Sequence, residues 1–239
     1  MNSTETDVVK QQVAAHWGRR APTFDAGFGH SIRTPAERVA WDRILTLVLD
    51  GRHALDALDA GCGTGFFGAW ARAQGAEVIS IDIGVNLVKE ARKKVGPRVV
   101  AGDVTNLGLA DRSFDVVISS ECIEHTLSPP AAVREMIRVL RPGGHLALTC
   151  PNRFWHWSCV LANALGKRPY HGLENWPGWF ALRRWVREAG GEVERHLGLH
   201  LVPFVLEPTH PVLRLLDRGG TVLGPLYVNQ CLLAIKMTS

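Results

Sequence analysis

The sequence lacks several features that mark large classes of protein. Its five cysteines form no Cys-x-x-Cys pair, and an odd number without metal-site spacing indicates free thiols in a reducing compartment, so we expect a cytoplasmic location. The polar opening MNSTETDVVKQQ has no apolar core and is not a signal peptide. No apolar run approaches the roughly 20 residues that span a membrane. The Trp-rich, apolar C-terminal third leaves peripheral contact with lipid open.

A strong excess of one charge is also missing. The 27 Lys and Arg residues are nearly balanced by 23 Asp and Glu residues, for a net charge of +4. The basic residues alternate with Glu and apolar residues at helical spacing, so solvated helix faces explain them better than a nucleic-acid surface does. With 239 residues, 46% of them hydrophobic, the chain suits a single globular domain over 1–239 and is too short for two full domains with a linker.

Strand and helix patterns alternate from about residue 55 onward. The expected strands are residues 54–60, 77–81, 98–101, 114–119, 145–150, 192–198 and 227–236, and the expected helices are residues 66–74, 85–95, 131–140 and 181–189. The strands are continuous apolar runs, and this order predicts a parallel sheet with helices on both faces. We therefore expect an α/β fold with a doubly wound, mostly parallel, seven-stranded sheet in a Rossmann-like arrangement.

The segments around this core should cover it. One N-terminal helix is expected over residues 5–20, ended by Pro22, and a second is expected from Thr34-Pro35 to about residue 49. After the strand that ends at Cys150 the alternation breaks and aromatic residues follow among Pro and Gly, which predicts an inserted lid. The expected division is cap helices over 1–50, the core over 55–150, the lid insertion over 151–180 and completion of the sheet over 181–239.

A glycine-rich loop follows the first strand of this core. Its sequence, Asp-Ala-Gly-Cys-Gly-Thr-Gly over residues 59–65, lets the backbone turn sharply and approach a ligand where no Cβ intervenes. Asp82 and Asp103 end the next two strands. The ligand crevice of an open α/β sheet lies at the carboxyl ends of its strands, where one acidic residue can accept from ribose hydroxyls and another from an adenine amino group. The joint occurrence indicates a nucleoside-containing cofactor.

Five successive motifs carry a resemblance to a known family: LDAGCGTG, SIDI, GDV, DRSFDVVISSECIEH and RVLRPGGHLALTCPN. They resemble those of class I S-adenosylmethionine (SAM)-dependent methyltransferases, closely over residues 55–150 and weakly to 198, and dinucleotide dehydrogenases lack the FDVV…LRPGG succession. The opening HWGRRAPTFDAGFGH is similar to the W-x-x-x-A-x-x-Y-D opening of ubiquinone-type O-methyltransferases of the methyltransferase type 11 group, with Phe24 where tyrosine is common. The resemblance implies SAM as cofactor.

The resemblance also implies cofactor contacts residue by residue. Asp82 would hold the ribose hydroxyls, and Arg33 or Arg38 would pair with the SAM carboxylate, which suits a guanidinium. Ser120 or Glu121 would lie under the sulfonium. The remaining implied contacts are Asp59, Gly61, Gly63 and Gly65 along the methionine part, Ile83 against the adenine, and Asp103 and Val104 at the adenine edge.

Candidate catalytic groups follow the fourth strand, in the motif Glu-Cys-Ile-Glu-His that contains Glu121, Glu124 and His125. A histidine can take a proton near neutral pH, so His125 is a candidate general base for a hydroxyl acceptor. The same motif is similar to a divalent-metal site in some relatives and to a structural turn in others. These alternatives stay open, with a metal less favoured than a base. His171 is a further candidate, because relatives often place a histidine there, facing the acceptor.

The aromatic residues of the insertion bear on the methyl acceptor, since they can wall an apolar pocket or form a small satellite core. They are Phe154, Trp155, Trp157, Tyr170, Trp176, Trp179 and Phe180. We expect a SAM-dependent methyltransferase that acts on a small aromatic or lipophilic molecule, with oxygen as the favoured acceptor. The alternatives are N-, C- or S-methylation, an RNA 2′-O-methyltransferase, which a basic channel would favour, and a non-catalytic SAM-binding module, which a blocked acceptor space would favour.

Overall fold

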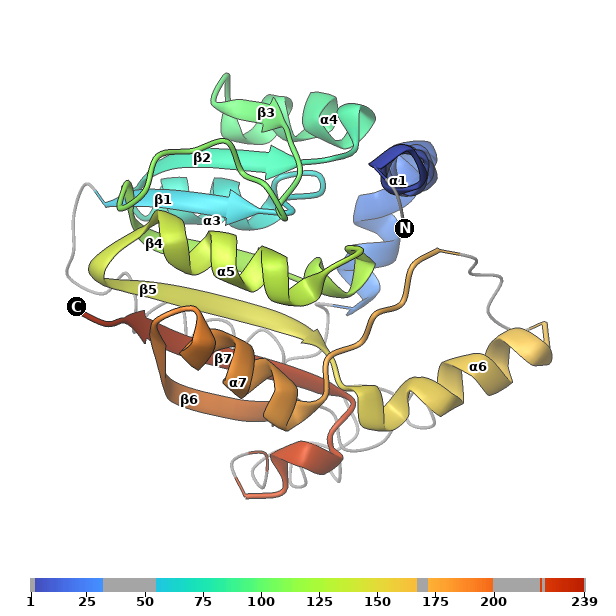
Figure 1. The fold of residues 1–239 in the computed structure, drawn as a ribbon. Coiled ribbons are helices and arrows are strands. Elements are labelled where there is room, and N and C mark those ends of the chain that lie inside the picture. Colours follow the sequence, from blue (N-terminus) through green and yellow to red (C-terminus); the bar gives the residue numbers. More distant parts are fainter. Residues whose placement is uncertain (1–2, 32–54, 167–171, 200–219, 221, 239) are drawn as a thin grey trace.

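The computed structural model describes residues 3–31, 55–166, 172–199, 220 and 222–238 (Figure 1). The strands are β1 Asp56–Ala60, β2 Glu77–Asp82, β3 Val99–Ala101, β4 Phe114–Ser120, β5 Leu140–Pro151, β6 Gly191–Leu199 and β7 Asn229–Lys236. The α-helices are α1 Ser3–Ser31, α3 Phe66–Ala73, α4 Val85–Val95, α5 Pro129–Val139, α6 His156–Ala164 and α7 Trp179–Glu188. The short 3-10 helices are η1 Ile123–His125, η2 Arg153–Trp155 and η4 Gly224–Leu226.

The strands form one seven-stranded sheet in the order β3-β2-β1-β4-β5-β7-β6. Strands β1 to β5 are parallel, and β7 lies antiparallel between β5 and β6. The prediction of an α/β fold with a mostly parallel, seven-stranded sheet is therefore confirmed. The strand order reverses between β1 and β4, so the carboxyl ends of these two strands flank the switch point where α/β folds bind ligands.

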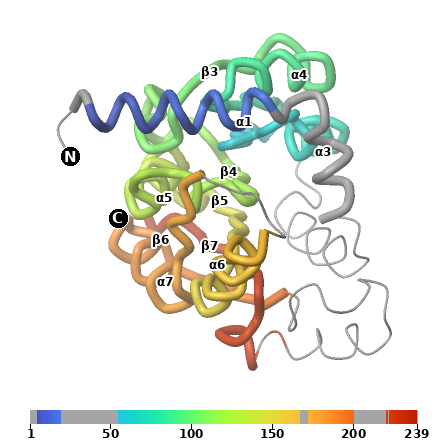
Figure 2. Tube along the Cα trace, turned by 90° about the vertical axis from the view of Figure 1, so that its right-hand side faces the viewer, coloured from blue at the N-terminus to red at the C-terminus, as the bar shows by residue number. Residues whose placement is uncertain are grey.

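Helices cover both faces of the sheet, and Figure 2 shows α5 and α7 on one side and α3 on the other. Neighbouring strand residues point to opposite faces, since Ala57 belongs to the core under α3 and α4 and Leu58 to the core under α5 and α7. The helix residues are Phe67, Ala71, Val88, Ala91 and Val95 in the first core, and Ala132, Val133, Met136, Leu182 and Val186 in the second. Burial on both faces explains the continuous apolar strands.

Helix α1 continues past Pro22 to Ser31, so the prediction that Pro22 ends this helix is wrong. Proline lacks the N–H that would donate to the carbonyl four residues earlier, here that of Gly18. The Gly18 carbonyl instead accepts from Asn86 Nδ2 at 3.3 Å. A contact with the start of α4 thus satisfies the oxygen that Pro22 cannot. The second helix expected up to about residue 49 lies outside the described residues.

The helix expected over residues 131–140 ends one residue earlier, and the Arg-Pro-Gly-Gly motif that follows belongs to strand β5. Helix α5 ends at Val139, and Leu140 already pairs with Phe114 of β4. Regular pairing resumes with His145 opposite Val116, so the motif bulges out of the ladder between these two pairs. The bulge lies at the amino end of the parallel strands, away from the switch point.

The segment expected as a lid divides into two parts. Segments η2 and α6 lead away from the sheet after β5, as Figure 1 shows. Trp176 and Trp179 instead are buried, and the Trp179 ring stacks on the His196 imidazole of β6 with centroids 3.4 Å apart. Helix α7 begins at Trp179, two residues before the expected start. Searching the described segments finds no helix with the length and apolar character needed to cross a membrane.

Candidate functional site

The loop after β1 turns at three glycines. Gly61, Gly63 and Gly65 have φ angles of +78°, +54° and +83°, a region that other residues rarely adopt. A Cβ on Gly61 would overlap Cys122 Sγ, and one on Gly65 would lie 2.8 Å from Val95 Cγ2. Glycine is therefore required at both positions because the loop packs closely against Cys122 and Val95. These glycines hold the loop in a tight turn at the carboxyl end of β1, beside the switch point.

Asp82 ends β2 beside this loop. Its Oδ2 accepts from the Gly63 N–H at 2.9 Å, and its Oδ1 accepts from the Gly84 N–H at 2.8 Å. Burial raises the pKa of Asp82 to about 6, and these two hydrogen bonds limit the rise. Each oxygen keeps a second lone pair, so the ionised carboxylate can still accept from two hydroxyls. The following residue, Ile83, is partly exposed beside it.

Asp59 and Val104, two other implied cofactor contacts, face the protein interior. Asp59 is 2% exposed and its Oδ2 accepts from the Gly68 N–H at 2.8 Å, so it joins β1 to helix α3. Burial raises the pKa of Asp59 to about 7, and the nearby Asp82 charge adds to the rise. The Val104 side chain packs in the core beneath α5. Only its backbone is left to meet an adenine edge.

Helix α1 crosses the carboxyl ends of the strands, as Figures 1 and 2 show, and contacts two site residues. Lys10 Nζ lies 2.7 Å from Asp103 Oδ2, and the Trp17 and His125 ring centroids lie 4.7 Å apart. Burial opposes ionisation of Asp103, but the hydrogen bonds from Lys10 and Thr105 outweigh it and lower the pKa of this carboxyl. Sequence reasoning missed both contacts. Lys10 and Trp17 share a helix face seven residues apart, yet nothing local identifies their partners.

The turn after β4 brings Ser120 and Glu121 to the same edge of the sheet. Glu121 has a φ of +49°, uncommon for a residue other than glycine. Ser120 Oγ and Thr149 Oγ1 lie 3.1 Å apart in a hydrogen bond, and the Glu121 N–H donates to the Thr149 carbonyl at 3.0 Å. Backbone strain of this kind costs about 1–3 kcal/mol and gathers at functional sites. The bonds to β5 hold the strained turn in place.

The His125 ring in η1 is held from two sides. Its Nδ1 lies 2.9 Å from the Leu173 carbonyl oxygen, and Trp17 packs against the ring. A carbonyl only accepts, so Nδ1 carries the proton and Nε2 keeps the lone pair of the neutral imidazole. Two segments distant in the sequence, α1 and the segment before α7, therefore orient Nε2 as the atom able to take a proton.

Glu124 is a buried carboxyl next to this imidazole, with its Oε1 3.7 Å from His125 Nε2. Burial, then the nearby Glu121 and Glu174 carboxylates, raise the pKa of Glu124 well above its usual range. Within the described part of the chain, no three His, Cys, Asp or Glu side chains are grouped to hold a metal ion. The Glu-x-x-Glu-His motif thus places the His125 imidazole beside a buried carboxyl group.

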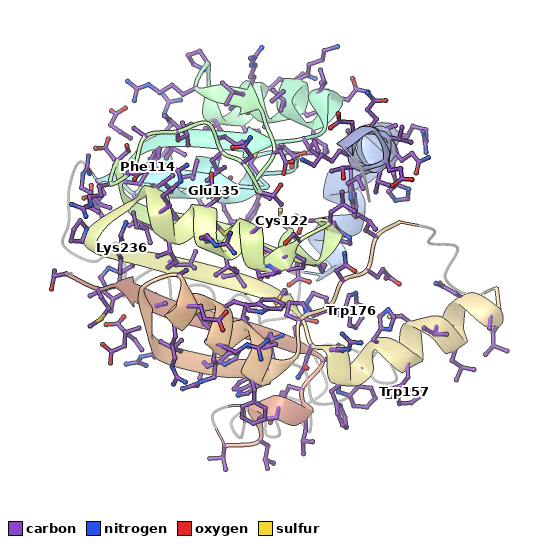
Figure 3. All side chains as sticks on the ribbon, in the orientation of Figure 1. Phe114, Cys122, Glu135, Trp157, Trp176 and Lys236 are labelled. Carbon is purple, nitrogen blue, oxygen red and sulfur yellow. The ribbon has the colours of Figure 1, made fainter. Side chains whose placement is uncertain are left out.

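Several expected site residues lie outside the described residues, namely Arg33, Arg38, Tyr170 and His171. The described aromatic residues of the insertion do not gather into one pocket. Phe154, Trp157 and Phe180 are exposed, whereas Trp176 and Trp179 are buried. Figure 3 shows Trp157 on the outer side of α6, away from the sheet, and Trp176 on the inner side.

A glycine loop and a strand-end aspartate lie together at the switch point of the sheet, the arrangement expected from the resemblance to class I SAM-dependent methyltransferases. Comparison with known families agrees, because residues 58–148 match the family described as a methyltransferase domain. Over this core the chain is similar to SAM-dependent methyltransferases, for which SAM is the cofactor.

The relatives match the core of the chain. The malonyl-[acyl-carrier protein] O-methyltransferase of Pectobacterium atrosepticum is 35% identical over 139 residues, 58% of this chain and 52% of that protein. The demethylmenaquinone methyltransferase of Paenarthrobacter aurescens is 29% identical over 149 residues, 62% of this chain and 58% of that protein. The chain thus spans about half the length of the curated relatives it matches.

Solved structures extend the likeness to most of the fold. A SAM-dependent methyltransferase from Mesorhizobium loti has a TM-score of 0.63 at 18% identity and covers 86% of this chain and 100% of its own. Magnesium protoporphyrin IX methyltransferase from Synechocystis, with bound SAH, has a TM-score of 0.59 at 20% identity and covers 83% of this chain and 82% of its own. At these identities the likeness shows the fold alone.

Replacing Asp82 with alanine should weaken SAM binding by about 2–3 kcal/mol, because a charged acceptor of hydrogen bonds is lost. Isothermal titration calorimetry measures this loss of affinity.

The same site should make SAM binding depend on pH. Only the ionised Asp82 carboxylate would accept from both ribose hydroxyls, and the pKa of Asp82 is about 6, so wild-type affinity should rise from about pH 5 to about pH 7 and then level off. The variant should lack this rise. Glu192→Ala, which removes an exposed carboxylate on β6, is the control. Unchanged affinity in folded Asp82→Ala would remove Asp82 from the ribose site.

Proposed function

We propose that this protein transfers the methyl group of SAM to an oxygen atom of a small lipophilic acceptor. The observation that carries the proposal is the orientation of His125: its Nδ1 donates to the Leu173 carbonyl, so Nε2, which lies 3.7 Å from Glu124 Oε1, bears the lone pair of the neutral ring. A hydroxyl acceptor needs such a base, whereas an amine needs less help. The imidazole lies just beyond the end of β4, beside the cofactor crevice.

The residues of the crevice fit the cofactor. SAM supplies a methyl group already activated by its sulfonium, so the protein mainly aligns the acceptor and excludes water. The bare backbone of residues 61–65 would hold the methionine part, and Asp82 would hold the ribose hydroxyls. His125 Nε2 would accept the hydroxyl proton of the acceptor. Trp17 packs on the imidazole and shields it from solvent on that side.

The names of the relatives suggest a second candidate, esterification of a carboxylate. One relative is named for a malonyl group on an acyl carrier protein and another for demethylmenaquinone. The identity of 35% over the core of the malonyl enzyme favours this second candidate. A carboxylate is already ionised near neutral pH and needs no base, so the two candidates predict different pH dependence.

Methyl transfer to an aromatic hydroxyl compound that stays protonated below about pH 9 separates these candidates. With SAM saturating, the rate should rise with pH as the His125 imidazole loses its proton, and mass spectrometry should identify an O-methyl ether. A rate independent of pH with a carboxylate acceptor, and a methyl ester as the product, would support the second candidate. Methylation at nitrogen or carbon alone would contradict both.

A further inference from the structure

Helix α6 turns its apolar side outward. Its exposed stripe consists of Trp157, Val160, Leu161, Ala164 and the following Leu165. Four of these side chains are large, and each is between 52% and 61% exposed. They recur at the three- and four-residue spacing of one helix face. The opposite side of the helix holds the buried Cys159 and the half-buried Asn163. A surface helix normally turns its apolar stripe to the core, so this polarity is reversed.

A second apolar group adjoins the base of α6. Trp155 Nε1 donates to the Leu226 carbonyl at 2.8 Å, and Asn152 Nδ2 donates to the Pro225 carbonyl at 2.9 Å, so η4 is held beside η2. Val222, Leu223, Leu226 and Phe154 add side chains that are 82%, 47%, 44% and 52% exposed. We call the stripe of α6, with these four residues, the α6–η4 face. Exposed apolar patches of this extent mark interaction sites.

The charge of the surrounding chain is positive. Residues 151–173 contain no Asp or Glu but contain Arg153, Lys167 and Arg168. Arg153 is exposed at the start of η2. Trp, Phe and Leu on one face with a basic residue at its edge, here Arg153, are typical of helices that lie in the interface of an anionic membrane. An acidic protein partner would require basic residues within the face, and the α6 stripe has none.

We propose that the α6–η4 face docks this protein on the surface of a bilayer that contains anionic lipid. The Trp157 ring, stacked on Trp155 at a centroid distance of 5.7 Å, enters the headgroup region, where indole rings are favoured. Figure 3 shows Trp157 on the side of α6 that such a bilayer would meet.

The base of α6 lies beside the segment that orients His125. The ring centroids of His156, the first residue of α6, and Trp176 lie 5.3 Å apart, and the same segment carries Leu173, whose carbonyl accepts from His125. A docked bilayer would therefore lie on the side of the molecule where the imidazole is oriented. The link to methyl transfer rests on the proposed function, whereas the docking itself does not.

Vesicle co-sedimentation of the full chain tests the docking. Wild type should bind vesicles of phosphatidylcholine with phosphatidylglycerol, and should bind vesicles of phosphatidylcholine alone more weakly. The Trp157→Ser/Leu161→Ser variant should lose at least ~10-fold in vesicle affinity. Val100→Ser, which changes a side chain 43% exposed on β3 at the far edge of the sheet, should bind as wild type. SAM affinity measured by calorimetry should be the same in all three, which shows that the fold is intact.

Three results would overturn the docking proposal. The first is that wild type binds neither kind of vesicle. The second is that the double variant binds vesicles as tightly as wild type does. The third is that the substitutions abolish self-association, or binding to an acidic carrier protein, in a protein that does not bind vesicles. That result would assign the face to a protein partner. Vesicle binding without any methyl transfer to a water-dissolved acceptor would instead contradict the proposed function and leave the docking face in place.

Discussion

The His125→Ala variant should turn over a hydroxyl acceptor about 10²–10⁴-fold more slowly than wild type, the usual contribution of a general base. Its SAM affinity should stay unchanged, because the ring contacts Leu173 and Trp17, which belong neither to the glycine loop nor to the turn of Asp82. Single-turnover rates with SAM saturating measure the loss at the chemical step, and calorimetry measures cofactor affinity.

Two comparisons make the His125 result specific. With an acceptor that is already ionised at the assay pH, the His125→Ala variant should lose the least rate, because such an acceptor has no proton to give. His145→Ala removes a buried imidazole of β5 whose Nε2 lies 3.6 Å from Glu194, and it should leave the rate within a few-fold of wild type once the protein is folded. If His125→Ala also stayed within a few-fold on a hydroxyl acceptor, alignment and desolvation would carry the catalysis.

The Gly61→Ala variant should lose more than ~100-fold in SAM affinity, as measured by equilibrium dialysis with labelled SAM. The φ of +78° costs a residue with a side chain about 1–2 kcal/mol. The added methyl group would also lie 2.6 Å from Cys122 Cβ and overlap the Sγ. Overpacking of this kind typically costs about 1–3 kcal/mol. The loop must therefore shift away from Cys122, and the backbone expected to meet SAM would shift with it.

Gly75→Ala is the matched control for this substitution. Gly75 has a φ of +90°, but nothing lies within 4 Å of the position that its Cβ would take. This variant shares the backbone strain without the overlap, so it should lower the melting temperature slightly and leave SAM affinity unchanged. A further variant, Gly61→Ala/Cys122→Gly, removes the overlapping atoms and should recover part of the affinity. Normal SAM binding by Gly61→Ala would show that no cofactor meets this backbone.

Much of the fold could be predicted because its signals are local. Helix α4 was expected over 85–95 and has those bounds, since Gly84 and Gly96 flank a run with Leu87 and Ala91 at helical spacing. Pro22 misled the prediction because its effect depends on Asn86, a residue far along the chain that bonds the Gly18 carbonyl. A rule about proline within one helix cannot include that partner.

The candidate site also has one part that the sequence predicts and another that depends on contacts between distant segments. The glycine loop and Asp82 follow from strand ends and spacing, and the structure brings them together through the Gly63 N–H. The contacts of α1 with Asp103 and His125 depend on how a distant helix packs, which periodicity does not specify. The tautomer of His125 likewise depends on the Leu173 carbonyl, a backbone atom with no signature in the sequence.

The central place of β7 has a consequence for synthesis on the ribosome. β7 is the last strand in chain order, yet it lies between β5 and β6. The parallel strands β1 to β5 can assemble as the chain emerges, but among the described strands β6 pairs with β7 alone. A nascent chain ending before Asn229 therefore leaves the edge of β5 open and β6 without a neighbour, a state prone to association with other chains. Translation must finish the final strand before either half of the sheet is protected.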